Sequence, residues 1–215
     1  MKIFVPIKEN SQRVPGKNFR KVQGTPLYLR LFEKLKEFEV YVDTDSNEII
    51  DDLSKRYSNV TAYRREERLE GDEVSVCDLI HSFISRFKIE KEWICQIHVT
   101  SPFLEKETLE KVRTFTGLEY DSIVSCNPVQ TRLWRKEKYG MCPINHNPIK
   151  LEQTQDLPVY YEENSLFYAF KSDMFLDIGV RIGRNPFFYE SRFPENLDID
   201  TEDDWKLVKK IAETN

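Results

Sequence analysis

A loop near the start of the chain concentrates groups that bind phosphate. Between residues 8 and 18 it carries three cations and three short polar side chains: Lys8, Arg13, Lys17, Asn10, Ser11 and Asn18. A triphosphate needs fixed positive charge and many N–H donors, and Gly16 permits close approach of the backbone. The loop lacks the GxxxxGKS or GxxxxGKT pattern of P-loop ATPases. It therefore predicts a phosphate site of another kind, with a solvated basic loop as the alternative.

Two carboxylates near the end of the chain have the spacing of a metal site. Asp198 and Asp200 flank the apolar Ile199, and on an extended segment both side chains face the same side. Two close carboxylates repel each other unless a cation lies between them, and Mg²⁺ prefers oxygen ligands completed by phosphate and water. The pair predicts Mg²⁺ as the cofactor. The alternative is an acidic segment that leads into a helix.

The composition limits the classes of partner. The chain has 215 residues, 40% of them hydrophobic, which favours one folded domain over disorder. A net charge of -5 gives no general attraction to nucleic acid or to an anionic membrane. The four cysteines lie far apart, which favours reduced thiols over zinc ligands. The apolar run at the N-terminus is too short for a signal peptide or a membrane span, so we expect a cytoplasmic protein.

Strand-like and helix-like segments alternate from residue 2 to about residue 126. Short apolar runs predict strands at Lys2–Ile7, Val40–Val42, Val60–Tyr63, Trp93–Val99 and Ser122–Cys126. Amphipathic periodicity predicts helices from about Thr25, and at Asn47–Tyr57, Val74–Phe87, Glu105–Phe115 and Thr201–Ala212. Thr25 is the expected N-cap of the first helix, with Pro26 at its first position, and Thr201 is the expected N-cap of the last. The rhythm predicts an α/β fold with a mainly parallel, doubly wound, Rossmann-like sheet.

The region after residue 128 departs from this rhythm. From Pro128 to Glu163 the chain is aromatic, charged and rich in proline, without a helical period. Strands return at Leu166–Phe170 and Phe187–Tyr189. We therefore expect residues 1–215 to form a single domain in which 128–165 is an irregular or hairpin excursion. In such sheets a ligand binds beyond the carboxyl ends of the strands.

Both ends of the chain resemble the acylneuraminate cytidylyltransferases, the CMP-sialic acid synthetases. The family pattern Arg-x-x-Ser-x-x-x-Pro-x-Lys-Asn is matched here by Ser11, Pro15, Lys17 and Asn18. The family's arginine is Lys8 in this chain, which keeps the charge but loses the bidentate fork. The resemblance implies a nucleotide-diphospho-sugar transferase fold, with phosphate contacts from the lysines and nucleotide contacts from Ser11 and Asn18. Arg13 is a candidate for the missing guanidinium.

The acidic run near the C-terminus and two middle segments carry the same resemblance. The run Asp198–Asp204 is similar to the family's DIDT ending, which holds the metal ligands. Arg65 and Asp72 match a segment that borders the base pocket in the family, although Arg65 can equally be a surface arginine. Thr100, Ser101 and Pro102 match the turn after the fourth strand of the family. His98 stands where the family has a glutamine that touches the sugar, and the alternative is a structural histidine.

The segment that contacts the sugar acid in the family is where this sequence departs most from the family pattern. The family's arginine before Leu-Pro, which pairs with the sugar carboxylate, aligns with Gln155, and Asn164 lies in the strand that follows. Arg132 and His146 are the alternative contacts for the acid. The resemblance also implies a homodimer contact through 128–165.

The predicted reaction is transfer of CMP from CTP to a 2-keto-3-deoxy sugar acid of the sialic acid type. Lys8, Lys17 and Asp200 are the expected catalytic residues. Three alternatives stay open at this point. They are a CTP transferase for another acid such as a manno-octulosonate, a glycosyltransferase that uses the DxD pair, and a nucleotide-binding protein without catalysis.

Overall fold

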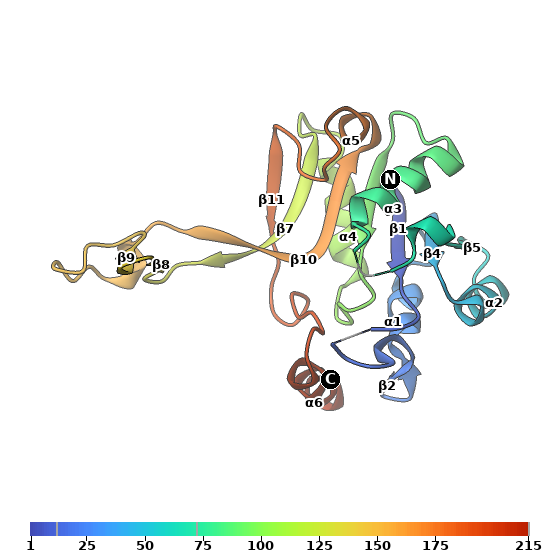
Figure 1. Cartoon of the computed structure of the whole chain (residues 1–215), viewed down its shortest axis with the longest axis horizontal. Helices are drawn as coiled ribbons and strands as arrows, with labels where there is room; N and C mark the ends of the chain where they lie inside the picture. The colour runs from blue at the N-terminus through green and yellow to red at the C-terminus, as the bar shows by residue number, and fades with distance from the viewer. Residues whose placement is uncertain (12, 72, 215) are drawn as a thin grey trace.

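A seven-stranded sheet forms the centre of the computed structural model, which describes residues 1–11, 13–71 and 73–214 (Figure 1). Its strand order is β11-β7-β10-β6-β1-β4-β5. Strand β10 is antiparallel to its neighbours β6 and β7, and the other neighbouring pairs are parallel. The strands span β1 Lys2–Ile7, β4 Val40–Thr44, β5 Val60–Arg64, β6 Trp93–Ile97, β7 Ser122–Val129, β10 Tyr160–Lys171 and β11 Pro186–Glu190.

Helices cover both faces of this sheet. They span α1 Leu27–Lys34, α2 Asn47–Arg56, α3 Val76–Phe87, α4 Lys106–Phe115, α5 Ser172–Ile178 and α6 Glu202–Thr214. Alternation along β1 sends Ile3, Val5 and Ile7 into the core cluster of α1, α2 and α4, and Phe4 into that of α3 and α5. The prediction of a mainly parallel, doubly wound α/β fold is therefore confirmed. Among the described helices, none is long and apolar enough to cross a membrane.

The predicted start of the first helix is wrong. Thr25–Pro26 form the short strand β3, which pairs with β2 at Lys21–Val22, and α1 begins at Leu27. Gln23 and Gly24 both have positive φ, at 51° and 80°, and such a pair closes a two-residue hairpin. The turn therefore takes Thr25 and Pro26 into the hairpin instead of the helix. The predicted N-cap of α6 is confirmed, since Thr201 Oγ1 accepts from the N–H of Asp204 at 3.2 Å.

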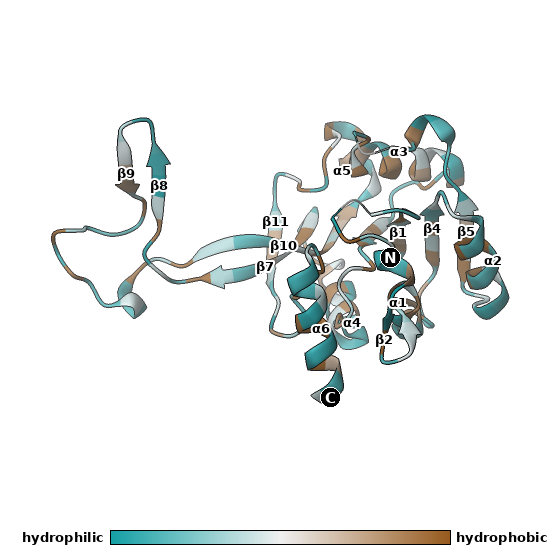
Figure 2. Ribbon diagram, turned by 60° about the horizontal axis from the view of Figure 1, so that its bottom comes forward, coloured by the Kyte–Doolittle hydropathy of each residue, from teal (hydrophilic) through white to brown (hydrophobic). Residues whose placement is uncertain are grey.

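Residues 130–159 form an arm that projects from the sheet as a continuation of β7 and β10 (Figures 1 and 2). The outer ends of β7 and β10 pair as a two-stranded ribbon, up to Val129 opposite Tyr160. Further out lie a hairpin of β8 (Trp134–Glu137) with β9 (Gly140–Pro143) and a 3₁₀ turn at Thr154–Asp156. Large apolar side chains of the arm are exposed: Trp134, Tyr139, Met141, Ile144, Ile149, Leu151 and Val159. The expected excursion thus appears as a hairpin arm that carries little core of its own.

Candidate active site

A cavity of about 470 Å³ lies at the carboxyl ends of β1 and β6. The strand order changes direction between these two strands, which is where doubly wound sheets bind ligands. Nine of the residues predicted for the site line it: Lys8, Asn10, Ser11, Arg13, Lys17, Asn18, Arg65, His98 and Thr100. Another predicted nucleotide-binding residue, Asp72, lies outside the described residues.

Lys17 joins the N-terminal loop to the acidic segment near the C-terminus. Gly16, with φ 63°, turns the loop into a 3₁₀ turn at Lys17–Phe19, which buries the lysine side chain. Its Nζ donates to the carbonyl of Ile199 at 2.5 Å, between Asp198 and Asp200 in the sequence. Burial lowers the pKa of Lys17, while Asp198 and Asp200 act in the opposite direction. Segments 182 residues apart therefore meet at Lys17. Lys17 lines the cavity, whereas Asp198 and Asp200 are not among its lining residues.

The two aspartates of that segment differ in their surroundings. Burial raises the pKa of Asp198, opposed by a hydrogen bond with Thr100, and its Oδ1 is buried without a partner among the described residues. Asp200 is half-exposed and forms an ion pair with Arg13 at 2.7 Å. A buried carboxylate oxygen without a partner costs free energy unless a cation or a donor meets it. The donor set therefore fits a divalent cation with two protein carboxylates, whose other ligands are phosphate and water.

The described residues contain no cluster of three or more His, Cys, Asp or Glu side chains arranged to hold a metal. Asp204 Oδ2 accepts from the N–H groups of Asp200 and Thr201 at 3.1 and 2.7 Å. Asp204 thereby orders the segment at the start of α6.

Arg65 is a buried cation in which one guanidinium nitrogen, Nη1, has no partner among the residues that the structure describes. Only 2% of it is exposed, which removes the alternative of a surface arginine. Its Nε is paired with Asp43, and its Nη2 donates to the carbonyls of Ile7 and Asp43 at 3.3 and 3.1 Å. Its Nη1 is buried with no partner among the described residues, and the side chain lines the cavity. The guanidinium is thus fixed by the sheet with a donor left for a ligand.

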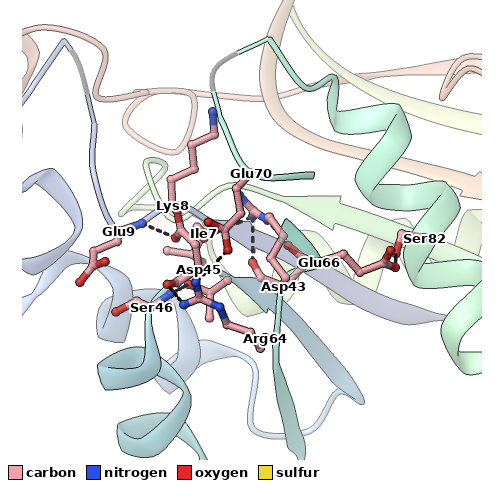
Figure 3. Close-up of polar contacts among 12 residues, drawn as sticks. Ile7, Lys8, Glu9, Asp43, Asp45, Ser46, Arg64, Glu66, Glu70 and Ser82 are labelled. Atoms are coloured by element: carbon pink, nitrogen blue, oxygen red, sulfur yellow. Dashed lines mark hydrogen bonds and ion pairs between the residues drawn. The ribbon is translucent and has the colours of Figure 1, made fainter. Parts of the chain in front are cut away.

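The remaining loop residues are held by contacts to the backbone. Asn18 Nδ2 donates to the carbonyl of Lys8 at 2.6 Å, while its Oδ1 is buried without a partner among the described residues. Lys8 Nζ donates to the carbonyl of Gly71 at 2.7 Å. Asp45, at the end of β4, accepts from the N–H of Glu9 at 2.7 Å and so orders this loop (Figure 3). These hydrogen bonds order the loop, and its amide and ammonium groups line part of the cavity.

The turn after β6 also lines the cavity. His98 and Thr100 are among the lining residues. Ser101 is buried and is not among them, and its N–H donates to the carbonyl of His98 at 3.4 Å. The N–H of Ile199 donates to the carbonyl of Thr100 at 3.0 Å, which attaches the acidic segment to this turn. Burial, together with the nearby charges of Arg181 and Lys17, lowers the pKa of His98 to about 4.

Four predicted substrate residues lie away from the cavity of this chain. Three are on the arm, where Arg132 donates to the carbonyl of Glu152, His146 packs against Trp134 at 5.0 Å, and the carbonyl of Gln155 accepts from Gln130. Asn164, on β10, donates to Asn127 Oδ1 at 2.8 Å and to Ser191 Oγ. None of these four is among the residues that line the cavity.

The sequence-based interpretation missed two residues next to the cavity. Gln96 lies fully buried in β6 and contacts both His98 and Arg181. A polar residue inside the apolar run Trp93–Val99 is a usable signal, because buried amides need partners. Arg181 follows α5 in an irregular segment, and nothing in the sequence relates it to residue 96.

The fold and this cavity define a nucleotidyltransferase of the α/β class. The model of the cytidylyltransferase family matches residues 3–215, and the chain belongs to this family. It is 28% identical to the CMP-N,N'-diacetyllegionaminic acid synthase of Legionella pneumophila, over 98% of this chain and 95% of that protein. It is 31% identical to the N-acylneuraminate cytidylyltransferase A of Danio rerio, over 93% of this chain and 48% of that protein. The chain therefore spans about half the length of the fish relative.

Solved structures show the same fold at lower identity. The CMP:2-keto-3-deoxy-manno-octonic acid synthetase complexed with CTP superposes with a TM-score of 0.65 at 15% identity, over 99% of this chain and 98% of that one. The 4-diphosphocytidyl-2C-methyl-D-erythritol synthase of Anaerococcus prevotii gives 0.69 at 12% identity, over 99% and 96%. The predicted resemblance to the acylneuraminate cytidylyltransferases is confirmed by the family match and by the curated relatives.

Proposed function

We propose that the protein transfers CMP from CTP to a 2-keto-3-deoxy sugar acid and releases pyrophosphate. One observation carries this proposal: the ammonium of Lys17 bonds to Ile199, between two aspartates, at the edge of a cavity lined by cations. Such a cavity accommodates the charge of a triphosphate, and a sugar acid fits the relatives named for acylneuraminate and diacetyllegionaminic acid. The particular acid is left to experiment, since Gln155 replaces the arginine expected to pair with its carboxylate.

The residues of the chain supply alignment and charge neutralisation. Lys8, Arg13 and Lys17 would hold the phosphates, and Lys17 would stabilise the charge that grows on the leaving pyrophosphate. Nη1 of Arg65, which has no partner within the described ranges, would suit the carbonyl of a pyrimidine base. Asp198 and Asp200 would hold Mg²⁺, which when bound supplies charge neutralisation and activation of the attacking hydroxyl. The sugar would approach from the side of His98 and Thr100.

A pyrophosphate-release screen tests the function directly. Four nucleoside triphosphates are combined with a panel of 2-keto-3-deoxy sugar acids that includes nonulosonates and a manno-octulosonate. We expect release with CTP and one class of acid. Release with none of the acids, together with calorimetric binding of CTP, would favour a non-catalytic nucleotide-binding protein. Transfer from a preformed CMP-sugar without pyrophosphate would favour a glycosyltransferase.

Replacing Lys17 by alanine should weaken the use of CTP. The loss of a charged hydrogen-bond donor at the phosphates is expected to raise KM for CTP between about tenfold and a hundredfold. Steady-state kinetics at saturating sugar acid measures the change. Lys21→Ala is the matched control, because that lysine lies four residues further on and is exposed. An unchanged KM for CTP in Lys17→Ala removes Lys17 from the site.

We further propose that the protein acts as a cytoplasmic homodimer joined through the arm. Ile149 and Leu151 are 94% and 87% exposed, which is costly for an apolar pair unless another surface covers them. Sedimentation velocity is expected to show a dimer. The double substitution Ile149→Lys and Leu151→Lys should give a monomer, whereas Leu207→Lys on α6, where the side chain is half-exposed, should not. A monomeric wild-type protein at micromolar concentration contradicts the proposal.

A further inference from the structure

A series of three hydrogen-bonded side chains, half-buried at its two ends, leads from the segment after α5 to the cavity. Arg181, in the segment after α5, donates from Nη1 to Gln96 Oε1 at 2.6 Å. Its guanidinium lies 3.7 Å from the centre of the Tyr168 ring, which fixes its plane. Gln96 is fully buried, and its Nε2 lies 2.8 Å from Nε2 of His98. Of these three hydrogen-bonded side chains, His98 is the one that lines the cavity.

The donors and acceptors of these three side chains allow one arrangement. A guanidinium only donates, so the oxygen of the Gln96 amide must face Arg181. The amide NH₂ then faces His98, and an NH₂ group cannot accept. Nε2 of His98 must therefore be the unprotonated, accepting nitrogen, and the ring proton must be on Nδ1. Among the residues that the structure describes, only Nε2 of this ring has a hydrogen-bond partner, which leaves Nδ1–H for a ligand.

The charges around His98 act in the same direction as this geometry. Burial disfavours the imidazolium, and two cations from different elements, Arg181 and Lys17, disfavour it further. Asp200 is the one group acting in the opposite direction among those that influence the ring. The pKa of His98 falls to about 4, so the imidazole is neutral at pH 7.

We propose that Arg181 and Gln96 are positioning residues that hold His98 as a neutral Nδ1–H donor to the acidic sugar. This inference rests on the proposed function for the identity of the ligand. A neutral donor recognises a hydroxyl or carbonyl oxygen of the sugar and leaves the sugar carboxylate to other groups. An imidazolium would instead act as the counter-ion of that carboxylate, with an affinity that falls as pH rises.

The tautomer can be measured without any substrate. Long-range ¹H–¹⁵N correlation spectra of the uniformly labelled full chain at pH 7 report the protonation of each ring nitrogen. The three histidines are His81, His98 and His146, and a His98→Gln sample assigns the signal. We expect His98 to be protonated on Nδ1 alone. Protonation on Nε2, or on both nitrogens, overturns the proposal whether or not the protein turns over any sugar.

Variants of the two positioning residues test the coupling to substrate. In Gln96→Glu a carboxylate accepts from Nε2–H and raises the pKa of His98, so KM for the sugar acid should become pH-dependent between about pH 5 and pH 8. In Arg181→Met the amide of Gln96 is free to turn, and we expect mixed tautomers with KM for the sugar about tenfold higher. KM for CTP should stay within about twofold in both variants.

The control is Arg184→Met, since Arg184 lies three residues further on with 84% of its side chain exposed. It should match the wild type in both the spectra and the kinetics. A wild-type tautomer in Arg181→Met, with an unchanged KM for the sugar, overturns the role of Arg181. If no sugar acid is turned over, the proposed function fails. The spectra of the wild type and of Arg181→Met still show whether Arg181 and Gln96 set the tautomer of His98.

Discussion

Replacing Asp200 by alanine is expected to lower pyrophosphate release from CTP by about a thousandfold or more, which corresponds to about 4 kcal/mol of barrier. The carboxylate lies beside Lys17 and Arg13, and it is the more accessible of the two proposed metal ligands. Its loss would leave the cation site with one protein carboxylate, that of Asp198, whose Oδ1 is buried without a partner in the described part of the chain. The measurement is a coupled pyrophosphate assay with saturating CTP and Mg²⁺.

The fold should survive this substitution. Arg13 loses its partner, but 67% of its side chain is exposed, so water replaces the carboxylate at little cost. Circular dichroism and thermal unfolding should match the wild type. Asp203→Ala is the control, because that side chain is 89% exposed, lies three residues away and pairs only with Lys206 among its described ion-pair partners. Full activity of Asp200→Ala in excess Mg²⁺ would remove the metal assignment.

The parts of the fold that the sequence predicted are those with strong local patterns. Continuous apolar runs located β1 and β6, and amphipathic periodicity located α2, α3 and α4 within two residues at each end. Thr25 and Pro26 were misplaced because their helix-start chemistry competes with a hairpin turn that depends on two positive φ angles. The antiparallel insertion of β10 between β6 and β7 was not predicted, since strand order depends on packing between segments far apart in the chain.

The residues of the candidate site also fall into those that a local sequence pattern reveals and those that only the folded chain brings together. The loop of Lys17 and the pair of Asp198 and Asp200 were recognisable because their residue types and spacing are local. The partner of Arg65 was not recognisable, because Asp43 lies 22 residues earlier on a neighbouring strand. Gln96 and Arg181 are 85 residues apart, so only the folded sheet brings them together. Sequence patterns thus indicate which groups bind phosphate, while the groups that hold the site in shape depend on tertiary contacts.

The ion pair of Arg65 and Asp43 supports the largest expected effect on stability. Both side chains are 1% exposed, and the pair fixes a guanidinium whose Nη1 faces no protein partner among the described residues. Replacing Asp43 by alanine would leave a buried positive charge without compensation. We expect the free energy of unfolding to fall by about 3–5 kcal/mol. Urea unfolding measures it, and Asp203→Ala should change it by less than about 1 kcal/mol.

A double variant distinguishes the cost of a stranded charge from the loss of packing. In Asp43→Ala with Arg65→Met the charge is gone, so the unfolding free energy should recover by about 1–3 kcal/mol over Asp43→Ala alone. If the double variant is no more stable than Asp43→Ala, the ion pair is not the source of the effect. The double variant should also bind CTP more weakly than the wild type at equal stability, as calorimetry with added osmolyte can measure. Recovered stability together with weaker binding of CTP would show that the buried ion pair presents Nη1 of Arg65 to the nucleotide. It would also show that the pair lowers stability relative to an apolar pair at the same positions.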